Sequence, residues 1–463
     1  MTPGADLAAP AGGRASELEQ PRRLVAVAAV LSSMALVVLD ASIVHVALPT
    51  IADALQVTPA RAVLVVTAYQ AALVMALLPL AALGERLGYR RVFVAGVAVF
   101  TAASVLCALS TSLPWLLAAR FLQGLGGAAV MALGVALLRF SVPPGRLGSA
   151  IGWNALTVAL ASAAGPSIGA WILSAATWPW LFAINLPIGA VALLASRALP
   201  VVRGRATAFD LMSAALNALM FGALIVGAEL VVDAPGWAAA LVVTAAVAGV
   251  ALTRREAAKS RPLVPLDLLR QPSFRASMIA SVCCFAGQTA GLVALPFFLQ
   301  HAMGKSALAT GLIMTAWPLS VAATAPIAGR LADRFPTGLL CAAGGATLAA
   351  GLMTVAVLPP QADLPLLLFG VILCGAGFGL FQTPNNRNMF LSAPAERAGA
   401  AGGAQGTARL TGQTAGAVLV TLLLGTGSVD GALRVTFSVG AALACAAAVV
   451  SVARASKPAP RAQ

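Results

Sequence analysis

The feature that most constrains this chain is a series of apolar runs of about 20 residues that recur along almost its whole length. A helix of that length spans the roughly 30 Å hydrocarbon core of a bilayer. Hydrophobic residues make up 60% of the 463 residues and charged residues only 10%, whereas a soluble domain carries about 25% charged residues. These proportions exclude a soluble enzyme with a closed core. The runs are continuous rather than alternating, which favours a helical membrane bundle over a β-barrel.

Charges, prolines and glycines divide the apolar sequence into fourteen expected transmembrane helices. We expect them at 24–49, 61–83, 91–110, 113–139, 147–173, 178–199, 209–232, 236–253, 275–299, 307–329, 337–358, 364–391, 398–425 and 432–453. The expected domains are a disordered tail (1–22), a six-helix bundle (23–200), two inserted helices (201–253), a linker (254–274), a second six-helix bundle (275–453) and a C-terminal tail (454–463).

The basic residues are distributed unevenly between the two sides of this predicted topology. If the N-terminus is cytoplasmic, 24 of the 29 Lys and Arg residues fall in cytoplasmic segments, which is the positive-inside pattern. The same asymmetry accounts for the net charge of +14 without a nucleic-acid partner. The sequence therefore predicts a multi-pass protein of the cytoplasmic (inner) membrane, with the tails and the linker in the cytoplasm.

Two parts of the sequence repeat each other. The segment AALGERLGYRR (81–91) is echoed by GRLADRF (329–335), so that Glu85 and Arg86 match Asp333 and Arg334 at an offset of 248 residues. Glycines of the fourth and fifth expected helices also have counterparts in the twelfth and thirteenth: Gly124, Gly126, Gly127, Gly165 and Gly169 correspond to Gly375, Gly377, Gly379, Gly412 and Gly416. We therefore expect two copies of one six-helix unit, an architecture typical of transporters that rock around a central site.

Several motifs resemble those of the fourteen-helix drug:proton antiporter branch of the major facilitator superfamily. LDASIVHVALP (39–49) is similar to LDxTIVNVALP, the 81–91 loop to GxLADRxGRRR, RFLQGLGGAA (120–129) to RxxQGxGAA, and GPSIGA (165–170) to the exporter motif GPxxGG. WPWLFAINLPIG (178–189) and GAGFGLFQTPNN (375–386) are also typical of the branch. The departures are His45 for Asn, Ala81 for Gly, Glu85 for Asp and Ala170 for Gly. The resemblance covers almost the whole chain and implies an all-α bundle that exports small molecules.

Asp40 and Arg120 are the charged residues that most suggest transport chemistry. A charge at the centre of a membrane helix costs about 2.5–3.5 kcal/mol on insertion scales, so such groups usually face a cavity or pair with one another. Counted from Pro49 and Pro114, the two residues lie at similar depth and could meet. Our interpretation is that Asp40 alternately holds a proton or a cationic substrate while Arg120 favours its ionised form. The alternative is a purely structural ion pair.

Two further groups of residues are interpreted through the resemblance. It implies a cytoplasmic gate formed by Glu85, Arg86, Gly88, Arg90, Arg91, Asp333 and Arg334, although topology alone would also explain the basic residues. It also implies that Gly165, Pro166 and Gly169 form the exporter motif of the fifth helix. Helix packing alone is the alternative for these three residues.

Polar residues inside the spans are candidates for a substrate cavity: Tyr69, Gln70, Gln123, Asn154, Gln288, Asn385 and Arg409. Each of them could instead form a hydrogen bond between helices. Glu229 is expected to be an interfacial residue, with a second substrate carboxylate as the alternative. His45 lies about 140° around its helix from Asp40, so we expect it to pack or form a hydrogen bond rather than relay protons.

The sequence thus favours a proton-coupled exporter of hydrophobic, often cationic, compounds. The cysteines form no metal-binding cluster, and no GxxxxGK[ST] pattern is present, so we expect no metal and no cofactor, with the proton gradient as energy source. The expected partners are a small-molecule substrate, protons and the lipid bilayer, and we expect a monomer. A dedicated exporter of one metabolite or antibiotic and a non-transporting membrane receptor are the alternatives; the chain offers no catalytic constellation for an enzyme.

Overall fold

The computed structural model describes residues 19–455, apart from 203, 205–208, 258, 260–265, 395–396 and 426–427. The secondary structure of this part of the chain is helical, with no strand. Thirteen of its helices are long and apolar enough to cross a membrane. A further helix, α15 (Ala398–Leu424), has 27 residues but is rich in Gly, Thr and Gln along its first two thirds. The expected number of fourteen spans is therefore consistent with the structure.

The N-terminal half follows the expected order of six spans, with one interruption. Its helices are α1 (Arg22–Ala54), α2 (Pro59–Leu87), α3 (Tyr89–Ala108), α4 (Leu113–Ser141), α5 (Leu147–Ala175), α6 (Trp180–Ala183) and α7 (Asn185–Ala195), and 3-10 turns lie at Pro144–Arg146 and Ser196–Ala198. The sixth span is interrupted at Ile184, since Pro187 has no N–H to donate to the carbonyl oxygen of Ala183. In contrast, α1 continues through Pro49 for five residues beyond its expected end.

The inserted pair and the C-terminal half complete the bundle. They comprise α8 (Leu211–Glu229), α9 (Pro235–Ala257), α10 (Leu266–Leu269), α11 (Pro272–Phe297), α12 (Ala307–Leu331), α13 (Thr337–Val357), α14 (Leu364–Leu391), α15 and α16 (Val429–Ala455). A π-helical turn at Phe298–Ala302 extends α11. The expected linker is shorter than 254–274, because α9 continues to Ala257 and α11 already begins at Pro272. The expected N-terminal tail falls mostly on residues 1–18, and the C-terminal tail mostly on 456–463, outside the described residues.

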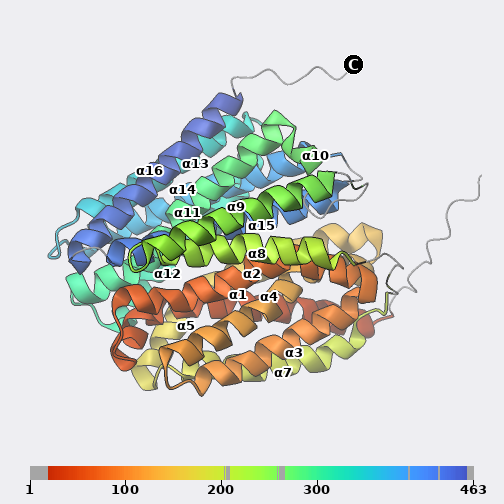
Figure 1. The fold of residues 1–463 in the computed structure, drawn as a ribbon, viewed down its shortest axis with the longest axis horizontal. Helices are drawn as coiled ribbons and strands as arrows, with labels where there is room; N and C mark the ends of the chain where they lie inside the picture. The colour runs from red at the N-terminus through yellow and green to blue at the C-terminus, as the bar shows by residue number, and fades with distance from the viewer. Residues whose placement is uncertain are drawn as a thin grey trace, which may run out of the picture.

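Two helical bundles lie side by side, the red-to-yellow N-terminal half against the cyan-to-blue C-terminal half (Figure 1). The main contacts between them are α2 with α15 and α5 with α12. The green helices α8 and α9 pack on each other, and α8 contacts both α2 and α15, so the inserted pair lies over one of these two seams.

The same close helix crossings occur in both halves. On α4, a Cβ at Gly124 would come within 2.5 Å of the Tyr69 carbonyl oxygen of α2. On α14, a Cβ at Gly375 would come within 2.2 Å of the Trp317 carbonyl oxygen of α12. Only glycine permits helix backbones to approach this closely. The matching contacts support the repeat that the glycine pattern predicts.

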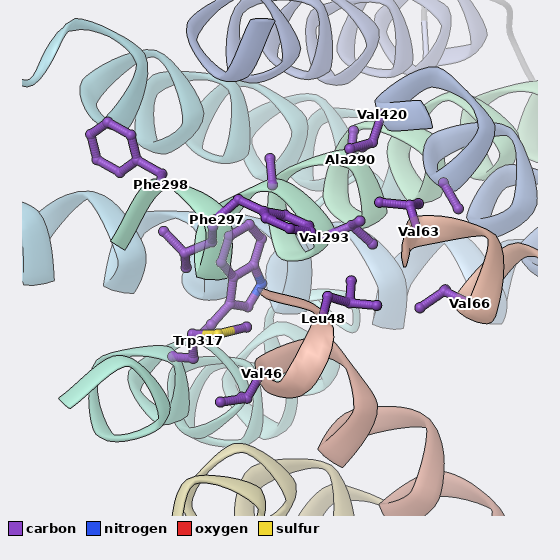
Figure 2. Packing of buried hydrophobic residues seen from close by; sticks show 14 of the residues in the cluster. Val46, Leu48, Val63, Val66, Ala290, Val293, Phe297, Phe298, Trp317 and Val420 are labelled. Atoms are coloured by element: carbon purple, nitrogen blue, oxygen red, sulfur yellow. The ribbon is translucent and has the colours of Figure 1, made fainter. Parts of the chain in front are cut away.

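The two halves are packed together at the end of the bundle that carries the turn between α1 and α2. Figure 2 shows Val46 and Leu48 of α1 beside Phe297 and Trp317 of the C-terminal half, and all four belong to one hydrophobic cluster. Hydrogen bonds also join the two halves here: Ser167 with Thr315 at 2.7 Å, and the Gln300 amide to the Val46 carbonyl oxygen at 3.3 Å. Near the opposite end, a separate core of Leu268, Phe274, Met389, Ala401 and Ala404 belongs to the C-terminal half alone.

Candidate functional site

The structure brings Asp40 of α1 and Arg120 of α4 into direct contact inside the N-terminal half. Arg120 Nη1 lies 2.6 Å from Asp40 Oδ2, and the two side chains are 1% and 0% exposed. In such a setting the desolvation of both charges offsets much of their attraction, so the pair adds little net stability. Removing one partner alone, however, would leave a buried unpaired charge.

Gln123 completes the contact from the next turn of α4. Its Oε1 accepts a hydrogen bond from Arg120 Nη1 at 2.6 Å, and its Nε2 donates to Asp40 Oδ1 at 2.9 Å. The spacing of three residues places Gln123 and Arg120 on the same face of the helix. Gln123, a cavity candidate from the sequence, is therefore fully buried in the ion-pair cluster.

Sequence reasoning missed two residues of this cluster, Asn185 and Ser104. Asn185 is the first residue of α7, and its Nδ2 donates to Asp40 Oδ1 at 2.7 Å. Ser104 of α3 accepts from Gln123 Nε2 at 2.8 Å and lies 3.3 Å from Asn185 Nδ2. In the sequence, Asn185 is marked by its position before Leu-Pro in an otherwise apolar span, within the segment WPWLFAINLPIG (178–189).

Arg120 is held on its other side by the backbone and by aromatic rings. Its Nε donates to the Val65 carbonyl oxygen at 3.3 Å. Its guanidinium carbon lies 4.3 Å from the centre of the Tyr69 ring and 5.5 Å from that of Phe182. Cation–π contacts of a desolvated arginine contribute about 2 kcal/mol. Tyr69 is thus a structural neighbour of the ion pair as well as a cavity candidate.

The C-terminal half has no counterpart of this cluster. Because Gly124 matches Gly375, Arg120 and Gln123 correspond to Val371 and Cys374 of α14, which are both buried. Because Gly169 and Ile43 match Gly416 and Ala290, Asp40 corresponds to Gly287 of α11. Among the described residues, the buried pair of Asp40 and Arg120 is therefore a feature of the N-terminal half.

Five other cavity candidates have a buried polar atom without a hydrogen-bond partner among the described residues. These atoms are Tyr69 Oη, Gln70 Oε1, Asn154 Oδ1, Gln288 Oε1 and Arg409 Nε. They come from α2, α5, α11 and α15, which belong to both halves. Arg409 also reaches across the seam, since its Nη2 lies 3.9 Å from Met131 Sδ of α4.

Asn385, in contrast, belongs to a hydrogen-bond network within the C-terminal half. Its Nδ2 donates to Ser281 Oγ at 2.8 Å, and its Oδ1 accepts from Arg454 at 3.1 Å. Asn385 is fully buried among α11, α14 and α16, so its contacts are those of helix packing.

Among the described residues, the predicted gate residues form no hydrogen bond or ion pair between the two halves. Glu85, Arg86 and Arg91 are exposed. Gly88 has φ +99°, a conformation that favours glycine, and a Cβ there would meet the Val202 carbonyl oxygen at 3.0 Å. Arg90 donates to the Arg197 carbonyl oxygen at 3.2 Å. In the second copy, Asp333 pairs with Arg387 of α14 at 2.6 Å, and Arg334 is exposed.

The fifth-helix motif lies at two helix contacts. A Cβ at Gly165 would come within 2.4 Å of Ser42 Cβ on α1, and Gly169 faces Ile43 of the same helix. Pro166 lies on the other side, where its carbonyl oxygen would be 2.4 Å from a Cβ at Gly311 of α12. The motif therefore packs α5 both within its own half and against the other half.

Glu229 lies near the seam that the inserted pair covers. Both carboxylate oxygens of Glu229 are buried and without a hydrogen-bond partner among the described residues. Thr67 of α2 and Thr421 of α15 lie beside it. Glu229 thus connects the inserted pair with both halves. His45 is partly buried on α1.

An ionic cluster ties α8 to α9 outside the membrane-spanning segments. Asp210 caps α8 by accepting from the Ser213 backbone N–H at 3.0 Å, and it also binds Arg255 and Lys259. The pKa of Asp210 is held well below its usual range, mainly by the Lys259 hydrogen bond and against the effect of partial burial. Among the described residues, no group of three His, Cys, Asp or Glu side chains gathers closely enough to bind a metal ion.

Comparison with known proteins places this arrangement in a family. The model of the Major Facilitator Superfamily matches residues 30–417 and 277–463. The chain belongs to the Major Facilitator Superfamily. It is 46% identical to the "uncharacterized transporter YebQ" of Escherichia coli (strain K12), over 97% of this chain and 99% of that protein.

Two more distant relatives have names that state a substrate or a phenotype. The multidrug resistance protein Stp of Mycobacterium tuberculosis is 32% identical over 84% of this chain and 73% of its own length. The riboflavin transporter RibZ of Clostridioides difficile is 31% identical over 80% of this chain and 81% of its own length. This chain is accordingly a multi-pass membrane protein of a transporter family whose members carry small molecules.

Proposed function

We propose that this protein is a proton-coupled exporter of hydrophobic, often cationic, compounds that works by alternating access across the cytoplasmic membrane. The observation that carries the proposal is the sealed ion pair of Asp40 and Arg120, which is present in one half and replaced by apolar residues in the other. Buried charges of this kind are costly in a membrane and mark proton or substrate pathways. The likeness to a multidrug resistance protein supports the choice of substrate.

Asp40 is the group that exchanges protons in this mechanism. While ionised, it holds Arg120, or else the positive charge of a substrate. Proton uptake removes that attraction, so the two protonation states favour different packings of α1 and α4. Because a cationic substrate and a proton compete for one carboxylate, outward movement of one is coupled to inward movement of the other.

The positive-inside pattern gives the expected orientation of the molecule in the membrane, and from it we infer the conformational state of the structure. It places both termini in the cytoplasm and the tightly packed end, with the turn between α1 and α2, on the outer side. From this orientation we infer that the structure represents an inward-facing state. Glu85 and Asp333 lie at the cytoplasmic end, where we infer that they close a gate in the other state. The monomer carries out transport with the proton gradient and no cofactor.

Polar atoms at the seam are the proposed contacts for the substrate. Tyr69, Gln70, Asn154, Gln288 and Arg409 offer unsatisfied groups from both halves. A few polar groups among apolar walls suit hydrophobic ligands of varied shape. The name of the relative RibZ supports a second candidate, export of one dedicated compound on the same scaffold.

Transport into inside-out vesicles tests the proposal. The vesicles are prepared from cells that express the protein. Their uptake is measured for a panel of cationic dyes and biocides and for neutral metabolites. We expect acidification-driven uptake of cations by the wild type and at most about one tenth of that rate for Asp40→Asn, because proton release is lost. Asp53→Asn, an exposed carboxylate on the same helix, is the matched control. Full proton-driven uptake by Asp40→Asn at normal expression would refute the proposal, and uptake of a single metabolite would favour a dedicated exporter.

A further inference from the structure

The side-chain amide of Asn185 is only half used in this structure. Its Nδ2 donates to Asp40 Oδ1 at 2.7 Å and approaches Ser104 Oγ at 3.3 Å. Its Oδ1 is buried and has no hydrogen-bond partner among the described residues, although the residue is fully buried. A buried carbonyl oxygen without a donor costs about 1–3 kcal/mol.

Of the two side-chain amides that contact Asp40, Asn185 is the one whose oxygen has no partner among the described residues. Gln123, the other amide that contacts Asp40, uses both of its ends. Its Nε2 donates to Asp40 and Ser104, and its Oε1 accepts from Arg120 Nη1 at 2.6 Å. Both amides thus donate to Asp40 Oδ1. The oxygen of Gln123 already accepts a hydrogen bond, whereas the oxygen of Asn185 has no partner among the described residues.

The two protonation states of Asp40 need different partners. An ionised carboxylate only accepts hydrogen bonds, and here it accepts from Arg120, Gln123 and Asn185. A protonated carboxyl group must also donate its O–H. Arg120 has no acceptor. Gln123 Oε1 already accepts from Arg120 Nη1, and Ser104 Oγ already accepts from Gln123 Nε2 at 2.8 Å and lies 3.3 Å from Asn185 Nδ2.

A half-turn of the Asn185 amide about χ2 would exchange the positions of Nδ2 and Oδ1. This torsion is broad and roughly two-fold in asparagine, so the turn needs no backbone movement. After it, Oδ1 would lie where Nδ2 now contacts Asp40. The free acceptor is therefore already next to the group that needs it.

We propose that Asn185 is a positioning residue that follows the protonation of Asp40. Its Nδ2 donates to the carboxylate, and after proton uptake its turned Oδ1 accepts the new O–H. Asp40 takes up one proton from water, and no other covalent bond forms or breaks. The hydrogen bond from Asn185 Nδ2 is replaced by one to Asn185 Oδ1. Asp40 then has a partner in both protonation states, because its carboxylate accepts from Asn185 Nδ2 and its carboxyl O–H donates to the turned Oδ1. This inference rests on the proposed function of Asp40 as the proton carrier.

Infrared difference spectroscopy of the purified full-length protein between acidic and alkaline pH tests the inference, with the proton itself as probe. In the wild type we expect a protonated-carboxyl band that is absent in Asp40→Asn, at the lower frequency typical of a hydrogen-bonded acid. Asn185→Leu should move this band to higher frequency and reduce vesicle uptake on the order of tenfold. Asn185→Ser, whose hydroxyl both donates and accepts, should restore part of both effects. An unchanged band in Asn185→Leu would overturn the inference.

A second measurement does not depend on the folding of any Asn185 variant. Wild-type protein with a ¹³C-labelled Asn side chain should show a pH-dependent amide carbonyl band that is lost in Asp40→Asn. Its absence from the wild type would overturn the role of Asn185 while leaving the proposed function intact. Absence of the Asp40 carboxyl band from the wild type at every pH would instead refute the proposed function, and the inference with it.

Discussion

At the scale of single residues, we expect stability and transport to depend on Asp40 and Arg120 in different ways. If both charges are neutralised, no buried charge remains that needs a partner. If one charge is removed, the other stays buried without a partner. The pair can therefore be dissected by comparing single and double variants.

We predict that Arg120→Leu destabilises the protein by about 3–5 kcal/mol, because the Asp40 carboxylate then has no ionic partner. The double variant Asp40→Asn with Arg120→Gln should regain most of this stability and yet show no proton-driven uptake. Thermal unfolding of the purified proteins in detergent measures the first effect, and vesicle transport the second. An Arg120→Leu protein as stable as the wild type would contradict the pairing.

Part of this site could be predicted from the sequence, and the limits have physical causes. Asp40 and Arg120 were identifiable because charges inside apolar spans are rare and the two lie at similar depth. Asn185 and Ser104 were not, since an uncharged polar residue in a membrane helix has no such cost and commonly binds a neighbouring helix. Gln123 was identified but placed in the cavity, because its direction depends on how α4 is rotated against α1.

At the scale of helices, the inserted pair is held at one end by Asp210 and its partners. We predict that Asp210→Ala loses about 1 kcal/mol of local stability from the missing N-cap alone. That loss corresponds to roughly fivefold faster hydrogen exchange of amides in the first turn of α8. Asp210→Asn keeps a good cap and should lose less. Equal exchange in Asp210→Ala and the wild type would show that the cap and the ion pairs do not hold this end.

The pH dependence of this cluster follows from the lowered pKa of Asp210. A carboxyl group whose pKa is lower in the folded state contributes stability at neutral pH and loses it as pH falls through that lowered value. The contribution should therefore persist in mild acid, near the usual Asp pKa of about 3.9, and disappear only below it. Exchange of the α8 amides followed from neutral to acidic pH checks this. Loss of protection already between neutral pH and mild acid, and absent from Asp210→Asn, would contradict it.

The seam between α5 and α12 should respond to bulk at Gly311. A side chain there meets the Pro166 carbonyl oxygen and Ala170 Cβ, at 2.4 and 2.3 Å for an ideal Cβ. We predict that Gly311→Val separates the halves at this end, because relieving the clash requires the backbone of α5 to move away from α12. Spin labels at the exposed positions Trp171 and Leu308, in a background without the six native cysteines, measure the distance.

Gly152→Val is the matched control for this seam, since nothing lies within 4 Å of a Cβ at Gly152. The label distance should increase in Gly311→Val and stay unchanged in Gly152→Val. An unchanged distance in Gly311→Val would show that this seam does not hold the halves together.

Helix positions were predictable where the local sequence decides them and uncertain where packing does. Most span boundaries follow the apolar runs closely, because the bilayer length selects them. Proline did not act uniformly: α1 continues through Pro49, whereas the sixth span breaks before Pro187. Neighbouring groups decide whether a membrane helix tolerates a proline, and the sequence does not show those neighbours.

At the scale of the whole molecule, two similar bundles differ in the buried pair of Asp40 and Arg120, and we expect this pair to decide which substrates are favoured. The predicted architecture is confirmed, because the glycine repeat specifies matching helix crossings. The relative placement of the halves was not predictable, since a transporter adopts more than one packing of the same helices. Hydropathy likewise does not predict that α8 packs against α2 and α15.

If Asp40 alone binds the charge of the substrate, monovalent cations should be exported better than divalent ones. A second positive charge would lack a partner in a medium of low dielectric constant, which is costly. Resistance of cells to matched pairs of monovalent and divalent biocides measures this preference. Equally strong resistance to both classes would contradict the assignment of a single carboxylate.

Proton release on substrate binding is the most direct test of Asp40 as the proton carrier. Purified protein in weakly buffered detergent solution is mixed with a cationic substrate while a pH indicator is monitored. We expect the wild type and Asp53→Asn to release protons, and Asp40→Asn to release none. Release of the same amount by Asp40→Asn would contradict it, because the proton would then come from another group.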